Sequence, residues 1–424
     1  MNHIKASFSV LLIAAIAVSV AGCATIQSGE TVAQTSDLMS DISPNTINGR
    51  MPDADFTESM ADFSIKLFKQ GMSDRENSLI SPLSVTLALA MTANGADGNT
   101  FTQMEKLLGG DIPLSKLNEY LKKYASILPN EDNSKLHIAN SVWFRDHEDR
   151  LLVETDFLQK CADYYNAALF KSKFNARTVR DINDWAKTNT AGMIDKIIDK
   201  IKDEDMLYLV NAITFDAEWE NMYWESDVSE GNFTDINGKT KRVYFMRSSE
   251  YTYINDDMAT GFIKPYATGY SFVALLPNEN ISLQAYIESL TGDGFLDLIE
   301  RSIEFNEDHF IKIETFMPKF EYEYKITLND TLKALGMTDA FERGIADFRK
   351  MGISQEGRLF ISEVLHKTYI SVDERGTRAG AATTANLEFF SGPTATVRLD
   401  RPFVYAIIDN STYLPIFFGT LMTV

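Results

Sequence analysis

The sequence predicts an α+β fold, because helical and strand patterns occupy different parts of the chain. Helical patterns dominate early, beginning with an amphipathic stretch at 56–68, whereas strand patterns dominate late, from 231 onward. This segregation differs from the strand–helix alternation of parallel α/β folds. No internal repeat is visible. The 424 residues are 45% hydrophobic, which suits a large core, and length alone would suggest two or three domains.

The early helices carry start and stop signals. Ser81 before Pro82 predicts a helix cap with proline in the first turn, followed by an apolar helix over 85–91. A further helix is expected around 179–190, where Gly192 would end it.

Strands are predicted where short apolar runs are bounded by turn residues. The run 207–215 is apolar almost throughout, which indicates a strand buried on both faces. The remaining predicted elements are strands over 136–144, several pieces between 231 and 277, 310–320, 367–372 and 403–408, and a short helix over 328–335.

The stretch 374–400 separates two predicted strands and is too long for a hairpin turn. Structureless loops of this length are uncommon unless they are functional. From 377 to 385 nearly every residue is Ala, Gly or Thr. Alternate residues of a strand face one side, and the alternate positions here are all small, so this stretch could enter a crowded sheet. On these residues alone, a flexible small-residue linker is the alternative.

Composition excludes several function classes. The net charge of −20 argues against a nucleic-acid partner, whose phosphates demand basic patches. The five histidines show no paired metal-ligand spacing, and neither a Cys-x-x-Cys pair nor a phosphate-binding glycine loop occurs. We therefore expect no metal, no cofactor and no enzymatic activity.

The N-terminus has the layout of a secretory signal, with a lysine followed by an apolar run that is short for a membrane span. Residues 1–22 end in small residues directly before Cys23, which resembles the lipobox of bacterial lipoproteins. We expect an exported protein anchored to a membrane through lipid on Cys23, at the cell surface or on the periplasmic face. Residues 23–50 are polar and predict a flexible tether. An ordinary cleavable signal with a chance cysteine is the alternative.

A set of short motifs, in a fixed order over roughly 55–424, resembles the serpin family. The motifs are Asn77-x-x-x-Ser81-Pro82-x-Ser84, Gly95-Ala-x-Gly98, Asn211 followed by Phe215 and Trp219, 316–320, 335–341, 361–367, Glu374-x-Gly376-Thr377, 401–403 and 415–419. Each is weak alone, and together they leave little room for chance.

The resemblance implies a single domain over 51–424, with three β-sheets, eight to nine helices and an exposed reactive-centre loop at about 374–400. This overrules the domain count suggested by length. It also implies structural roles, in or near a buried polar network called the shutter, for Asn77, Ser81, Pro82, Ser84, Asn211, Trp219 and His366. The same serines and histidine could otherwise be imagined as a catalytic set.

The resemblance further implies a suicide inhibitor of serine proteases that acts as a monomer. The cut loop would insert into the central sheet through a hinge made of Glu374, Gly376, Thr377, Ala379, Ala381, Ala382 and Thr383. Arg378 departs from the acidic residue usual at its position and should face solvent.

In typical inhibitory serpins the residue before the cut lies sixteen places after the hinge glutamate, so the resemblance implies a cut between Phe390 and Ser391. An aromatic residue before the cut suits a chymotrypsin- or elastase-like protease. Phe389 and Leu387 remain alternatives for the cut, and a non-inhibitory binding or carrier protein remains the alternative function.

Overall fold

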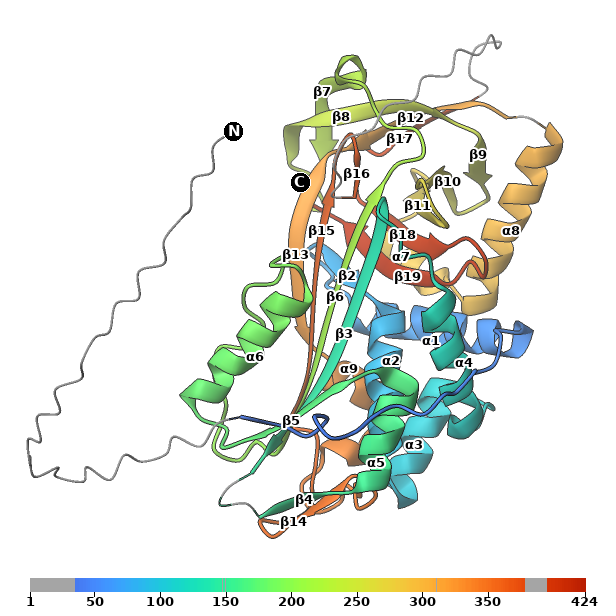
Figure 1. The fold of residues 1–424 in the computed structure, drawn as a ribbon. Helices are drawn as coiled ribbons and strands as arrows, with labels where there is room; N and C mark the ends of the chain where they lie inside the picture. Colours follow the sequence, from blue (N-terminus) through green and yellow to red (C-terminus); the bar gives the residue numbers. More distant parts are fainter. Residues whose placement is uncertain (1–34, 147, 149, 310, 378–394) are drawn as a thin grey trace, which may run out of the picture. The chain divides into compact units, whose positions relative to one another are not determined.

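The computed structural model describes residues 35–146, 148, 150–309, 311–377 and 395–424 (Figure 1). These residues form three sheets of four or more strands, a two-stranded ribbon and nine α-helices. The predicted α+β class is confirmed.

The largest sheet has the strand order β1-β5-β3-β6-β16-β15-β13. Its strands are β1 Ser36–Asp37, β5 Ala168–Ser172, β3 Ser134–Arg145, β6 Leu207–Glu218, β16 Gly376–Thr377, β15 Glu363–Val372 and β13 Phe320–Thr327. Strand β6 runs antiparallel to β3 and parallel to β15. The first nine residues of β6 are buried, as its apolar sequence predicts for a central strand.

Two further sheets pack near one end of this sheet (Figure 1). The six-stranded one comprises β2 Ser78–Ile80, β19 Pro415–Leu421, β18 Phe403–Asp409, β11 Tyr270–Pro277, β10 Ala259–Pro265 and β9 Thr252–Asn255. The four-stranded one comprises β17 Ala395–Arg398, β12 Ile313–Pro318, β8 Thr240–Glu250 and β7 Val228–Thr234. Strands β14 Gly352–Ser354 and β4 Leu151–Val153 form the ribbon.

The predicted strand over 310–320 corresponds to parts of two strands in different sheets. β12 ends at Pro318 and β13 begins at Phe320. Proline has no N–H to continue a ladder, so a break at this point follows from the chain itself.

The helices include the four predicted from sequence, which are α1, α2, α6 and α9, and others that were not predicted. Their bounds are α1 Ala54–Gly71, α2 Pro82–Ala93, α3 Gly98–Gly109, α4 Leu114–Ile127, α5 Thr155–Lys160, α6 Ala176–Asn189, α7 Leu283–Ser289, α8 Gly292–His309 and α9 Asn329–Ala334. Shorter helical turns are η1 Cys161–Tyr165, η2 Glu225–Asp227 and η3 Asp339–Phe341. None of the helices within the described ranges is long and apolar enough to span a bilayer.

Helix α2 is buried along its whole length behind the large sheet. Ser81 caps it by accepting a hydrogen bond from the Ser84 N–H, and Pro82 opens its first turn. All twelve of its residues are buried, and α2 packs against strands β3 and β6.

Residues 35–50 correct one prediction, because they are docked on the domain instead of forming the second half of a flexible tether. Strand β1 pairs with the edge strand β5. Farther on, both the backbone N–H and the side-chain amide of Asn45 donate to the Asp163 carboxylate, at 2.7 and 3.1 Å. Leu38, Met39 and Ile42 pack against the core. Burial of these three apolar side chains and pairing with the exposed edge of the sheet stabilise the docking of this segment. Its mostly polar composition gives no sign of this.

Candidate functional site

The centre of the large sheet is only partly closed. From Glu363↔Tyr208 to Thr368↔Ile213, strands β15 and β6 pair directly in parallel. Above this stretch the two residues of β16 lie between them, antiparallel to both (Figure 1). The chain therefore enters the sheet at one end of an existing strand pair.

The residues of β16 fit a crowded position. A Cβ added to Gly376 would lie 1.9 Å from the Ala217 carbonyl oxygen, so only glycine fits there without a shift. Thr377 is 1% exposed, and its Oγ1 lies 2.6 Å from the Tyr266 hydroxyl. Strand β16 thus places a small side chain inward, into a site with one matching polar partner.

The turn before β16 is held by the chain that follows β6. The Trp219 N–H donates to the Arg375 carbonyl at 2.8 Å, and its indole N–H donates to the Asp373 carbonyl at 2.9 Å. The Tyr223 N–H donates to the Glu374 carbonyl at 2.9 Å. These three bonds fix the backbone of 373–375, which we call the hinge turn.

The Glu374 side chain forms an ion pair with Lys319, and each side chain is about a third exposed. Burial alone would raise the pKa of the Glu374 carboxyl. The hydrogen bond and charge of Lys319, a backbone hydrogen bond and the nearby Arg375 outweigh burial, so the pKa is lowered. Glu374 is thus a carboxylate at neutral pH and ties the hinge turn to the start of β13.

Lower in the sheet, a buried polar network joins β15, β6, β3 and α2. Asn211 donates to the Ser84 carbonyl at 2.9 Å and to the Asn140 Oδ1 at 2.6 Å. His366 Nε2 accepts the Ser81 backbone N–H at 3.1 Å, and Nδ1 lies 2.5 Å from the Asn211 Oδ1. Because Nε2 accepts, the ring carries its proton on Nδ1 and is neutral.

This geometry argues against catalysis. His366 is fully buried, and it bonds to the Ser81 backbone instead of its hydroxyl, so Ser81 and His366 do not form a nucleophile–base pair. Burial lowers the pKa of His366 to about 3. Among the described residues no group of three or more His, Cys, Asp or Glu could hold a metal ion.

The other predicted site residues are distributed as follows. Asn77 lies outside the network and holds the C-terminal end of the chain: its Oδ1 accepts from Met422 and Thr423, and its Nδ2 donates to the Thr423 carbonyl. Seven predicted residues fall outside the described ranges, namely Cys23, Ala379, Ala381, Ala382, Thr383, Phe390 and Ser391.

Sequence reasoning missed Asn140 and Tyr266. Asn140 faces Asn211 across the β3–β6 pair. A polar residue in the middle of the apolar run 136–144 is the signal that could have found it, because a buried amide requires a partner. Tyr266 carries no comparable local signal.

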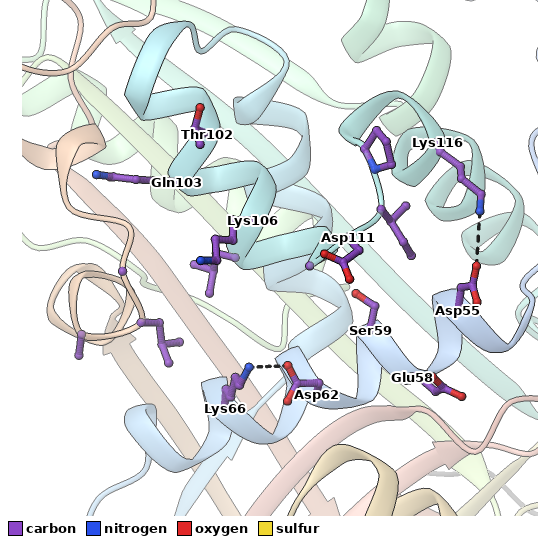
Figure 2. A pocket seen from close by; sticks show the side chains of 18 residues that line it. Asp55, Glu58, Ser59, Asp62, Lys66, Thr102, Gln103, Lys106, Asp111 and Lys116 are labelled. Atoms are coloured by element: carbon purple, nitrogen blue, oxygen red, sulfur yellow. Dashed lines mark hydrogen bonds and ion pairs between the residues drawn. The ribbon is translucent and has the colours of Figure 1, made fainter.

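A groove of about 1000 Å³ lies between α1, α3 and the start of α4 (Figure 2). Its lining mixes charged and polar side chains with apolar ones such as Leu107, Ile112 and Leu335. The ion pair Lys116–Asp55, at 3.8 Å, joins α4 to α1, whereas Lys66–Asp62, at 2.5 Å, runs along α1 (Figure 2). None of its lining residues belongs to the strands, hinge turn or network described above.

Comparison with known proteins identifies relatives of this arrangement. The family model described as Serpin (serine protease inhibitor) matches residues 58–424. Leukocyte elastase inhibitor A of Mus musculus is 30% identical over 375 residues, which cover 84% of this chain and 96% of that protein.

Among solved structures, the thermophilic serpin tengpin in its native state is 53% identical, with a TM-score of 0.88, over 92% of this chain and 100% of that one. Tengpin in its latent state gives a TM-score of 0.78 over 89% and 100%. Human thyroxine-binding globulin is 24% identical, with a TM-score of 0.75 over 87% and 98%, a likeness of fold alone. The described residues therefore resemble native tengpin more than latent tengpin.

Proposed function

The chain belongs to the serpin family, and we propose that it is a suicide inhibitor of chymotrypsin- or elastase-like serine proteases. Serpins are protease inhibitors whose targets are serine proteases, although the family also includes carriers. The observation that carries the proposal is β16, which already lies between β6 and β15 and is continued in sequence by further small residues.

The proposed mechanism begins with attack by the protease serine on the Phe390 carbonyl. The Ser391 amine leaves, and an ester joins Phe390 to the protease. The freed strand then extends β16 downward and replaces the direct pairing of β6 with β15. The new ladder has roughly a dozen hydrogen bonds worth about 1 kcal/mol each, a gain that can carry the bound protease away and distort its active site.

A denaturing gel of the purified protein mixed with chymotrypsin tests this function. A band near the summed mass that resists boiling in detergent supports trapping. Cleavage without such a band favours the carrier alternative, which thyroxine-binding globulin illustrates by its name and its fold.

Replacing Phe390 with Arg is expected to shift inhibition from chymotrypsin toward trypsin, because the buried carboxylate of a trypsin pocket prefers a cation. Inhibition rates for both proteases measure the shift, and the small C-terminal fragment should begin at Ser391. Phe389→Arg is the matched control and should not create comparable trypsin inhibition. If only Phe389→Arg does so, the cut lies one residue earlier.

We also propose that Cys23 carries the lipid that anchors the protein to a membrane in its host. Cys23→Ser should move the protein from the membrane fraction to the soluble fraction. Without the lipid, only the N-terminal apolar segment could hold the protein at the membrane, and that segment would be cleaved or would bind the membrane weakly. Cys161→Ala, which changes the other cysteine, is the control and should stay with membranes. Membrane fractionation of Cys23→Ser equal to wild type would contradict the anchor.

A further inference from the structure

A buried ion pair lies directly behind the hinge turn. Lys264 of β10 is 1% exposed and its Nζ donates to the Glu250 Oε1, at the end of β8, at 2.8 Å. Among the ion pairs of the described residues, this one has the most completely buried partners, with side chains 1% and 6% exposed. It joins the four-stranded sheet to the six-stranded sheet where both approach the end of β6.

The Lys264 ammonium is contacted by further groups besides Glu250. A second hydrogen goes to the Asn221 carbonyl at 3.0 Å. The cation also faces two aromatic rings, with Nζ 4.5 Å from the Tyr223 ring centroid and 5.4 Å from that of Trp219. The three partners on this side all belong to 219–223, the segment whose backbone holds the hinge turn.

The Glu250 carboxylate is fixed in turn. Ser248 Oγ donates to Glu250 Oε1 at 2.5 Å and lies 2.9 Å from the Thr315 Oγ1 of the neighbouring strand. The pair is therefore part of a chain of contacts that runs from β12 and β8, through Lys264, to the segment 219–223.

We propose that Lys264 and Glu250 are positioning residues for loop insertion, which act through 219–223 on the hinge turn. They hold the Trp219 and Tyr223 N–H groups in place, and these groups hold the backbone from which β16 starts. Because insertion extends β16 from this fixed start, the pair preorganises its first step. The inference rests on the proposed inhibitory function and names two further residues that serve it.

Stability alone is a poor explanation for this pair. Two charges removed from water lose hydration, and apolar residues of similar volume in their place are often neutral or stabilising. The Lys264 cation holds the Asn221 carbonyl and the faces of the Trp219 and Tyr223 rings at the same time. A leucine or methionine at this position could not hold these three groups in place.

The test compares the full-length wild type with the double variant Lys264→Met/Glu250→Leu. Hydrogen exchange read by mass spectrometry should be several-fold faster in peptides covering 219–223 and 373–377, while the denaturation midpoint is not lowered. If inhibition holds, more inhibitor molecules should be consumed per protease trapped. Unchanged exchange at both peptides would overturn the inference.

Three further variants sharpen the result. Lys264→Arg keeps the cation and should keep slow exchange, whereas the charge swap Lys264→Glu/Glu250→Lys places an anion against the rings and should not. Should the double variant fail to fold, Glu250→Gln keeps shape and acceptor and should still speed exchange; no change in it would reject the proposal. Since exchange is measured without protease, it is separate from the proposed function, which fails only if the wild type traps no protease.

Discussion

A Thr377→Arg variant is expected to be cut by chymotrypsin as a substrate and to release the protease active instead of trapping it. Thr377 is 1% exposed, and its hydroxyl contacts Tyr266. An arginine in this position would bury a long cation without a partner, which costs several kcal/mol. Because Thr377 already lies in the sheet, this cost would displace β16 in the intact protein. Insertion would then have to begin by burying the arginine, so the acyl-enzyme should hydrolyse before insertion can distort it.

Residual chymotrypsin activity and the gel assay measure the effect, and the C-terminal fragment should begin at the same residue as in the wild type. Thr377→Val is the matched control, since it keeps the small size and loses only the contact with Tyr266. It should retain most of the trapping. Undiminished inhibition by Thr377→Arg, or no gain in thermal stability when the wild type is cleaved, would contradict insertion.

Local patterns in the sequence predicted the elements that position this site. The apolar runs of β3 and β6 and the Ser81–Pro82 cap of α2 depend on neighbouring residues, so they can be recognised without a structure. The depth of β16 could not be predicted in this way. It depends on where direct pairing of β6 with β15 ends and pairing of β6 with β16 begins. Both pairings join residues more than a hundred positions apart in the chain.

Two other features also could not be predicted from local sequence. Lys264 and Glu250 are fourteen positions apart in different sheets, and nothing in either local sequence indicates that they meet. The docking of 35–50 was concealed differently, because three apolar residues are diluted by polar neighbours when composition is averaged. The predicted part of the site therefore follows from local sequence patterns, whereas the rest depends on which distant segments pack together.

Acidification from pH 7 to pH 5 is expected to destabilise the protein through His366. Burial lowers its pKa from 6.5 to about 3, so between these values the unfolded chain binds a proton that the folded protein does not. Stability is therefore complete above pH 6.5 and falls as pH falls toward 3, by about 1.4 kcal/mol per unit. At pH 5 the loss from this one group should be about 2 kcal/mol.

Urea denaturation of the wild type and His366→Gln at both pH values isolates this contribution. The variant is less stable at pH 7, because the network loses its ring, but its loss between pH 7 and pH 5 should be smaller by about 2 kcal/mol. His137→Gln, at an exposed position of β3, is the control and should keep the wild-type dependence. Equal pH dependence in wild type and His366→Gln would remove His366 as the cause.

The same proton should act on the opening of the sheet. At pH 5 the closed network keeps the ring neutral, but a ring exposed by opening would take up a proton. With hydrogens on both nitrogens, Nε2 could no longer accept the Ser81 N–H that ties β15 to the start of α2. Weakening that tie favours separation of β15 from β6, the step that insertion requires. Wild type incubated at pH 5 should therefore lose trapping activity, assayed after return to pH 7, faster than wild type kept at pH 7. In His366→Gln the two rates should be alike, and a difference as large as in wild type would assign the acid effect to other groups.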